Sequence, residues 1–264
     1  MQSLSAVAVI IGLFYTAGTY RMAEEKARTD QFTKAVEYLE SDRINSRIMG
    51  IYTLERMARD SEQDYTMVMG MFTNSLRQWT AVRKSIDTVS PTRSKEEAPE
   101  VTDPRPDIQA LLTVLARRTR IYGSGETEPL NLRKLQLQGF NLSSANFQGA
   151  DLTEASLQNA YLRGANLQNA SLEQAKLQDA FLGAAQLWGA NLQGANFQGA
   201  NLWDAELQGA NLQGASLEQA KLQGVNLTAV KHLTQAQVNI ACFDDSSILP
   251  QGLEKPAPCR SRKP

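Results

Sequence analysis

Few side chains in this 264-residue sequence could carry out catalysis or hold a metal ion. There is one histidine, His232, and there are two cysteines, Cys242 and Cys259. A zinc site normally uses four ligands, so these three residues are too few. The two cysteines could form a disulfide in an oxidising compartment, whereas in the cytoplasm they would be free thiols. We therefore predict no catalytic, metal-binding or cofactor-binding residues, and we expect that the chain is not an enzyme.

Charged residues between positions 130 and 229 are sparse and balanced. Paired carboxylates could perform hydrolysis, but the acids here stand singly; they are Asp151, Glu154, Glu173, Asp179, Asp204, Glu206 and Glu218. The bases are Arg133, Lys134, Arg163, Lys176 and Lys221. Seven acids against five bases leave this stretch near −2, and the whole chain carries −1. The stretch is not basic enough to favour direct binding of nucleic acid.

These residues lie on a segment that repeats every five positions, twenty times, from Leu130 to Ala229. A typical unit is A-N-L-Q-G at residues 190–194, with Leu or Phe always in the middle. Within a unit the alternation resembles a strand, with Ala and Leu inward and the amides outward. The fifth residue breaks this alternation and is often Gly, which tolerates the dihedral angles of a turn. Such units cannot bury a core alone and must stack as a solenoid.

The unit resembles the motif A-(D/N)-L-x-x of the pentapeptide repeat family. That resemblance implies a mainly β fold, a right-handed quadrilateral β-helix with four units in each coil and about five coils here. Large residues replace Ala in the first coil and at the last, which indicates that the end coils pack against caps; they are Leu130, Leu135, Phe140, Val225 and Val230.

The first 20 residues contain no charged side chain and are strongly apolar from Leu4 onward. Because a membrane span needs about 20 such residues, we predict an N-terminal transmembrane helix. A cleaved signal peptide and a buried helix are the alternatives. Arg21, Lys26 and Arg28 follow the span, and by the positive-inside rule they favour a single-pass membrane protein with a cytoplasmic body.

Residues 21–86 carry apolar side chains at helical spacing and are predicted to form a small helical domain. Its segment from Ala35 to Asp60 resembles the helical region that precedes the repeats in membrane-associated bacterial, often cyanobacterial, members of the family. That resemblance implies a plasma or thylakoid membrane. The helical region is also a candidate for self-association into a homo-oligomer.

The remaining boundaries follow from composition. We predict a linker at 87–106, a capping helix and the loop after it at 107–129, the β-helix at 130–229, and a C-terminal cap and tail at 230–264. Three arginines close the capping helix, namely Arg117, Arg118 and Arg120. We expect them to complement the negative end of the helix dipole.

With four units in a coil, residues 20 apart lie on the same side of the rod. Columns of Asn and Gln then form ladders that stability alone explains. One side collects Tyr161 and Phe181, with Arg163 and Trp203 two positions on, and Trp188 lies near the adjoining corner. Aromatic residues beside an Arg are enriched at protein interfaces. We predict that this patch binds a protein partner, unless it packs against the helical region of the same chain.

Two functions therefore stay open. The first is a non-enzymatic, membrane-anchored scaffold that presents faces of the β-helix to a protein partner. The second is a soluble or exported inhibitor or protector of an enzyme such as a DNA topoisomerase. Some pentapeptide repeat proteins protect DNA gyrase by mimicking DNA with a strongly acidic rod, and the weak net charge here does not favour such mimicry.

Overall fold

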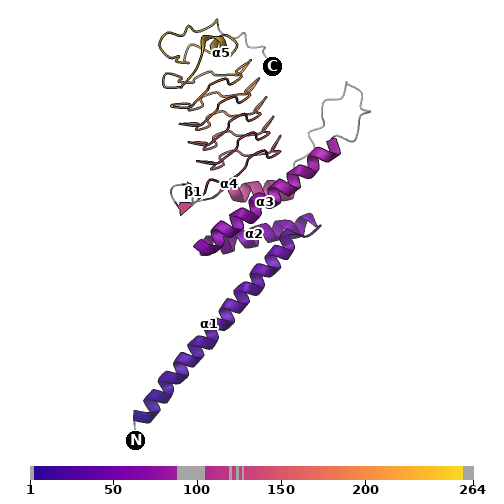
Figure 1. Cartoon of the computed structure of the whole chain (residues 1–264), viewed down its shortest axis with the longest axis vertical. Helices are drawn as coiled ribbons and strands as arrows, with labels where there is room; N and C mark the ends of the chain where they lie inside the picture. The colour runs from indigo at the N-terminus through magenta and orange to yellow at the C-terminus, as the bar shows by residue number, and fades with distance from the viewer. Residues whose placement is uncertain (1–2, 88–104, 119–120, 123–124, 127, 258–264) are drawn as a thin grey trace. The chain divides into compact units, whose positions relative to one another are not determined.

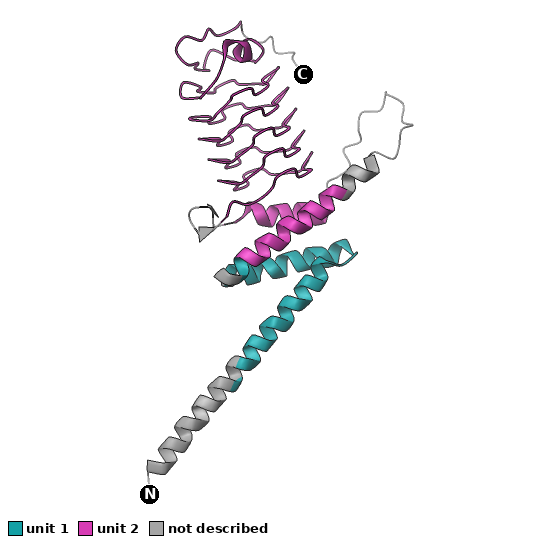
Figure 2. Cartoon of the chain, viewed as in Figure 1, with its two compact units in different colours: residues 1–65 teal, residues 66–264 magenta. Residues whose placement is uncertain are grey.

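The computed structural model describes residues 3–87, 105–118, 121–122, 125–126 and 128–257. In chain order the elements are α1 (Ser3–Leu39), α2 (Ile44–Asp60), α3 (Glu62–Asp87), α4 (Pro106–Ala116), β1 (Ile121–Tyr122), β2 (Gly125–Glu126) and α5 (Gln235–Asn239) (Figure 1). β1 and β2 pair in parallel. The chain divides into two compact units, residues 1–65 and 66–264, which Figure 2 shows in different colours.

Unit 1 is built around α1 and α2, which pack against each other. Leu39 of α1 and Ile51 and Leu54 of α2 belong to its core, each at most 2% exposed. The helices approach closely at Gly50, where a Cβ atom would lie 2.5 Å from the backbone nitrogen of Leu39. A side chain at this position would therefore push the two helices apart.

The predicted membrane localisation is wrong. Within the part of the chain that the structure describes, no helix is both long enough and apolar enough to cross a membrane. The predicted anchor fell on residues 1–20, and except for Thr19 the side chains of these residues lie outside the described ones. The described side chains of α1 include exposed charged residues such as Glu24, Glu25 and Lys26. The largely apolar α4 has 11 residues, whereas a span needs about 20.

Unit 2 contains the repeats, which form a solenoid of coils with a period of 20 residues. Parallel bridges join residues 20 apart, such as Tyr161 with Asn141 on one side and with Phe181 on the other. The backbone of each coil bonds to both neighbours: Asn191 N donates to Ala170 O of the preceding coil at 2.9 Å, and Leu192 N donates to Asn211 O of the following coil at 3.0 Å. Each pair of coils bonds in both directions, since Leu172 N also donates to Asn191 O at 2.8 Å. Four pentapeptides thus complete one turn of a β-helical solenoid (Figure 1).

The interior of the solenoid consists of the first and third residues of each unit. Every one of them from Leu130 to Leu227 is at most 5% exposed, including the larger residues Phe140, Phe147 and Phe197. This agrees with the predicted alternation, in which Ala and Leu point inward. Each buried methylene in a layer stabilises the stack by about 0.8 kcal/mol.

The corners have one backbone conformation whatever their residue type. The fifth residue of every unit from Lys134 to Gly224 has a positive φ. Asn and Asp reach this conformation readily, but Lys134, Glu154 and Ala184 adopt it as well. A turn hydrogen bond closes each corner, as from Ala175 N to Leu172 O at 3.0 Å. The closed turn and the bonds between coils hold residues that would not choose this conformation alone.

The first coil exposes backbone groups on its free edge, and side chains from preceding helices bond to them. Gln109 of α4 donates from Nε2 to Asn141 O at 2.8 Å and accepts from Asn141 N at 3.1 Å. Arg118 donates to Asn146 O at 2.9 Å and to Gln148 O at 2.6 Å. Arg77 of α3 donates to Arg133 O at 3.2 Å. An unpaired edge would otherwise be open to pairing with another chain.

The last coil is closed by α5 and the segment after it. Thr234 and Gln237 form a capping box at the start of α5. The buried Gln237 donates from Nε2 to Leu212 O at 2.8 Å and to Ala215 O at 2.9 Å, and Ser247 Oγ donates to Leu222 O at 3.0 Å. Asp244 accepts hydrogen bonds from both the hydroxyl and the backbone N–H of Ser247. Both ends of the solenoid are therefore covered by polar side chains aimed at backbone groups.

Two corner glycines allow the cost of a side chain contact to be separated from the cost of the corner conformation. Gly189 has φ +64°, and an added Cβ would lie 2.4 Å from Asn169 Oδ1. Gly214 has φ +66° with open space around it. We expect Gly214→Ala to lower the free energy of unfolding by about 1 kcal/mol, and Gly189→Ala by about 0.5–1 kcal/mol more because Asn169 must leave its rotamer. Urea denaturation measures both values, and combining Gly189→Ala with Asn169→Gly should remove the excess. Equal losses in the two single variants would contradict this interpretation.

The C-terminal cap should make stability depend on acidity. Hydrogen bonds from the Ser247 and Ser246 hydroxyls hold the pKa of Asp244 well below its ordinary value of 3.8. A carboxyl whose pKa is lower in the folded state stabilises the protein above the unfolded pKa, and that contribution is lost as pH falls through the folded pKa. We expect Asp244→Asn to lower the thermal midpoint at neutral pH and to weaken its fall between about pH 5 and pH 2. Asp245→Asn removes the same charge from an exposed neighbour and serves as the control. Identical pH profiles for the two variants would exclude this role of Asp244.

Candidate functional site

One side of the solenoid carries a pair of exposed aromatic rings in register. Tyr161 and Phe181 are bridged partners on successive coils. Their ring centroids lie 4.9 Å apart with an angle of 7° between the planes, so the rings are stacked. Tyr161 is 49% exposed and Phe181 is 42% exposed. The register of the coils, which follows from the backbone bonds, therefore brings together two residues that are 20 apart in the sequence.

The neighbouring outward column of the same side holds Arg163, Gly183 and Trp203. Arg163 and Trp203 are exposed, the latter to 59%. Gly183 lies between them in the column and is the only glycine at the fourth position of any unit. A Cβ at Gly183 would meet only Trp203 O, at 3.6 Å. The missing side chain leaves open space beside Phe181, between a guanidinium and an indole.

Trp188 lies on the next side of the same coil as Phe181. It is 47% exposed, and its carbonyl accepts from Asn169 N at 2.8 Å. Among residues 130–229, Tyr161, Phe181, Trp188 and Trp203 are the large hydrophobic side chains that stay exposed. We define the aromatic patch as these four residues together with Arg163. The structure thus places four members of the predicted patch on one side and Trp188 around a corner from them.

Amide side chains on the outward columns form hydrogen bonds that hold the local backbone in place. Asn191 Oδ1 accepts from Gln193 N at 3.2 Å, and Asn201 Oδ1 accepts from Trp203 N at 3.1 Å. Direct bonds between coils also occur, as from Asn211 Nδ2 to Asn191 Oδ1 at 3.3 Å. These bonds account for the recurring Asn and Gln without a ligand. They also fix the backbone from which Trp203 projects.

Several charges of the solenoid are paired on the side opposite the stacked rings. Arg133 lies 3.6 Å from Asp151 and also 3.6 Å from Glu154, and Lys134 lies 3.5 Å from Glu154. Exposed pairs of this kind contribute little to stability. They do reduce the field of the rod further, in addition to its small net charge. The surface therefore lacks the strong acidity that imitation of nucleic acid requires.

The structure describes two of the three residues whose side chains could carry out chemistry, His232 and Cys242. His232 is exposed, with φ 60°, just after the last complete unit. Cys242 belongs to the last ladder, where it pairs with Lys221, and it takes part in a disulfide. Cys259 lies outside the described residues, so the Cys242–Cys259 pairing stays a prediction. Among the residues that are described, no three His, Cys, Asp or Glu side chains group together as a metal site.

The residues that close the two ends were not recognised as such from the sequence. Arg118 is 5% exposed and bonds to carbonyls of the first coil, whereas we expected it to act on the helix dipole. Gln109 was not singled out at all. Asn and Gln occur throughout the repeats and flanks, so composition cannot distinguish the one amide that meets a free edge.

Comparison with known proteins agrees with this geometry. The family described as pentapeptide repeats matches in eight copies, over residues 131–169, 165–204 and 190–228. A search of curated proteins gives no match.

Solved structures of similar proteins include three from photosynthetic organisms. The pentapeptide repeat protein Rfr23 from Cyanothece 51142 is 29% identical over 45% of this chain and 87% of its own, with a TM-score of 0.32. One from the thylakoid lumen of Arabidopsis thaliana is 31% identical over 36% and 69%, with a TM-score of 0.31. The protein alr5209 from Nostoc PCC 7120 is 31% identical over 38% and 84%, with a TM-score of 0.27.

The repeat matches, the sequence identity and the coils of 20 residues lead to one assignment. This chain belongs to the pentapeptide repeat family, as its five-residue repeat predicted.

Proposed function

We propose that the protein is a non-enzymatic interaction scaffold, whose solenoid binds a protein partner through the aromatic patch. The observation that carries this proposal is the exposure of four large aromatic side chains on an otherwise amide-rich surface. Groups of exposed apolar side chains on a protein surface commonly mark interaction sites. Within the described part of unit 2, residues of α3 and α4 and Arg118 bond to the first coil through residues outside the patch.

The patch is suited to a protein surface because it is rigid and mixed in character. The Tyr161 and Phe181 rings stack on each other and stand on a backbone bonded to both neighbouring coils. Little side-chain entropy is therefore lost when a partner packs against them. Arg163 adds a guanidinium beside the rings, and Tyr, Trp and Arg are the residues that most often dominate binding energy at interfaces.

The missing side chain at Gly183 leaves a depression in this surface. A projecting side chain of the partner can pack there against Phe181 and Trp203. Because Gly183 has an ordinary backbone conformation and open surroundings, a larger residue can fill the space without disturbing the coil. This gives a variant that tests binding separately from folding.

Substitution of the aromatic patch should abolish partner binding and leave the fold unchanged. We expect Tyr161→Ala, Phe181→Ala and Trp203→Ala together to weaken binding by at least about 30-fold, since one such aromatic is worth about 2 kcal/mol or more. Gly183→Glu should weaken binding as well. A photo-crosslinking residue at position 181 should capture one protein that the same residue at the exposed position 193 does not capture.

The matched control is Gln193→Ala with Gln213→Ala, two exposed amides on the opposite side. All variants should keep the thermal midpoint of the wild type, because exposed substitutions change stability by only about 0.5 kcal/mol. The proposal fails if the triple variant captures the same protein as the wild type, or if the control variant loses it equally.

A further inference from the structure

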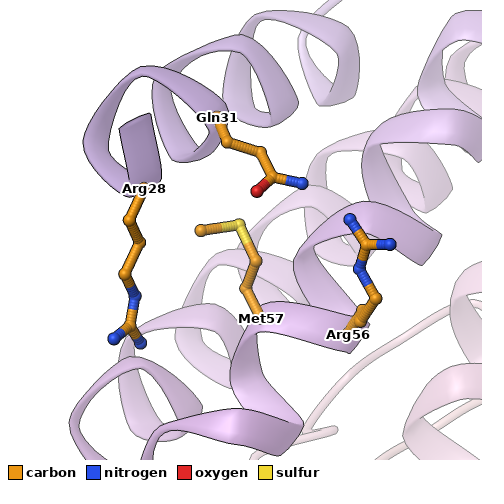
Figure 3. Close-up of a pocket in the computed structure, with 4 residues that line it drawn as sticks. All are labelled: Arg28, Gln31, Arg56 and Met57. Atoms are coloured by element: carbon orange, nitrogen blue, oxygen red, sulfur yellow. The ribbon is translucent and has the colours of Figure 1, made fainter. Parts of the chain in front are cut away.

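Unit 1 contains a cavity that is open to solvent and has no part in the proposed partner binding. It has a volume of about 450 Å³ and is lined by Arg28 and Gln31 of α1 and by Arg56 and Met57 of α2 (Figure 3). Small-molecule sites have volumes of roughly 300–1,000 Å³. The cavity is therefore large enough for a small organic ligand.

The lining combines an apolar floor with hydrogen-bond donors on opposite walls. Met57 is 7% exposed and presents its thioether to the cavity. Figure 3 shows the Gln31 amide and the Arg56 guanidinium directed toward one another from the two helices. Because α1 and α2 are packed together as far as Gly50 and Leu39, these walls are held in place by the core of unit 1.

One wall of the cavity carries Arg56, whose guanidinium is exposed to solvent. Arg28 donates to Asp64 at 2.5 Å, so its charge is partly neutralised. The side chains of Arg56 and Gln31 form no hydrogen bond or ion pair with any residue that the structure describes. Glu55, the neighbour of Arg56, pairs instead with Arg59 at 3.1 Å. No carboxylate is among the lining residues whose side chains the structure describes.

We propose that this cavity binds a small organic carboxylate. A guanidinium presents parallel N–H groups that match both oxygens of a carboxylate, so Arg56 holds the charged end of the ligand. Gln31 Nε2 donates a further hydrogen bond to the same group from the opposite wall. The apolar body of the ligand lies on Met57, whose flexible thioether adapts to its shape. Arg28, which is held by its ion pair with Asp64, adds positive potential at the edge of the cavity.

The test is a titration of the full chain with benzoate, observed through methionine methyl groups labelled with ¹³C. Among the methionines that the structure describes, Met57 is the one that lines the cavity, so its signal should shift and saturate. The exposed Met49 of the same helix should not respond. Benzamide has the same shape without the charge and should bind at least about tenfold more weakly, as expected for the loss of a charged hydrogen bond.

Two arginine variants distinguish a site from general electrostatic attraction. Arg56→Gln should weaken benzoate binding by about tenfold or more. Arg59→Gln removes the same charge one turn further along α2, outside the cavity, and should bind as the wild type does. The proposal is overturned if Met57 does not shift, if benzamide binds equally well, or if the two variants lose the same affinity. None of these outcomes bears on the aromatic patch, which lies in unit 2.

Discussion

The pairing of backbone groups between successive coils is the constraint on which the solenoid depends. Each coil both donates to and accepts from each neighbouring coil, between residues 19 or 21 apart, as Leu172, Asn191 and Ala170 show for one pair of coils. Everything else follows from keeping this ladder unbroken. The interior is uniform because each layer must fit the next, and the corners share one conformation because a different turn would shift the register. The two ends have no neighbouring coil, so they need Gln109, Arg118, Gln237 and Ser247.

This constraint also explains why the functional candidates lie where they do. Inward positions tolerate only residues that fill the layer, and corner positions must accept a positive φ. Only the outward columns can therefore accept many different residue types. Many Asn residues there accept a hydrogen bond from the backbone N–H two residues further along. Tyr161, Phe181 and Trp203 depart from this pattern without changing the backbone beneath them. These three aromatic residues make their side of the rod suited to recognition, whereas the Asn and Gln columns only support the coil.

Periodicity made the interior of the solenoid and the members of the patch predictable from the sequence. Any residue whose role repeats every 5 or 20 positions could be assigned, and the 20-residue period alone pairs Tyr161 with Phe181 across coils. Residues that act once could not be assigned. Arg118 sits in a cluster of arginines that fits a helix dipole equally well, and its carbonyl partners at Asn146 and Gln148 lie about 30 residues away in sequence. The cavity beside Arg56 depends on how two helices cross, which helical spacing alone does not determine.

The closed ends have a consequence for how such a chain can change in length. Because α4 matches the first coil and α5 matches the last, each cap belongs to a particular side of the rod. Removing or inserting 20 residues returns every side to its place and gives a shorter or longer rod between the same caps. Removing 5 residues turns all later units by one side together with the C-terminal cap, which keeps its own carbonyls but changes sides relative to α4. If those residues lie between Tyr161 and Phe181, the two rings no longer share a column. Only changes of whole coils therefore keep the outward columns aligned, so a recognition surface can move along the rod far more easily than around it.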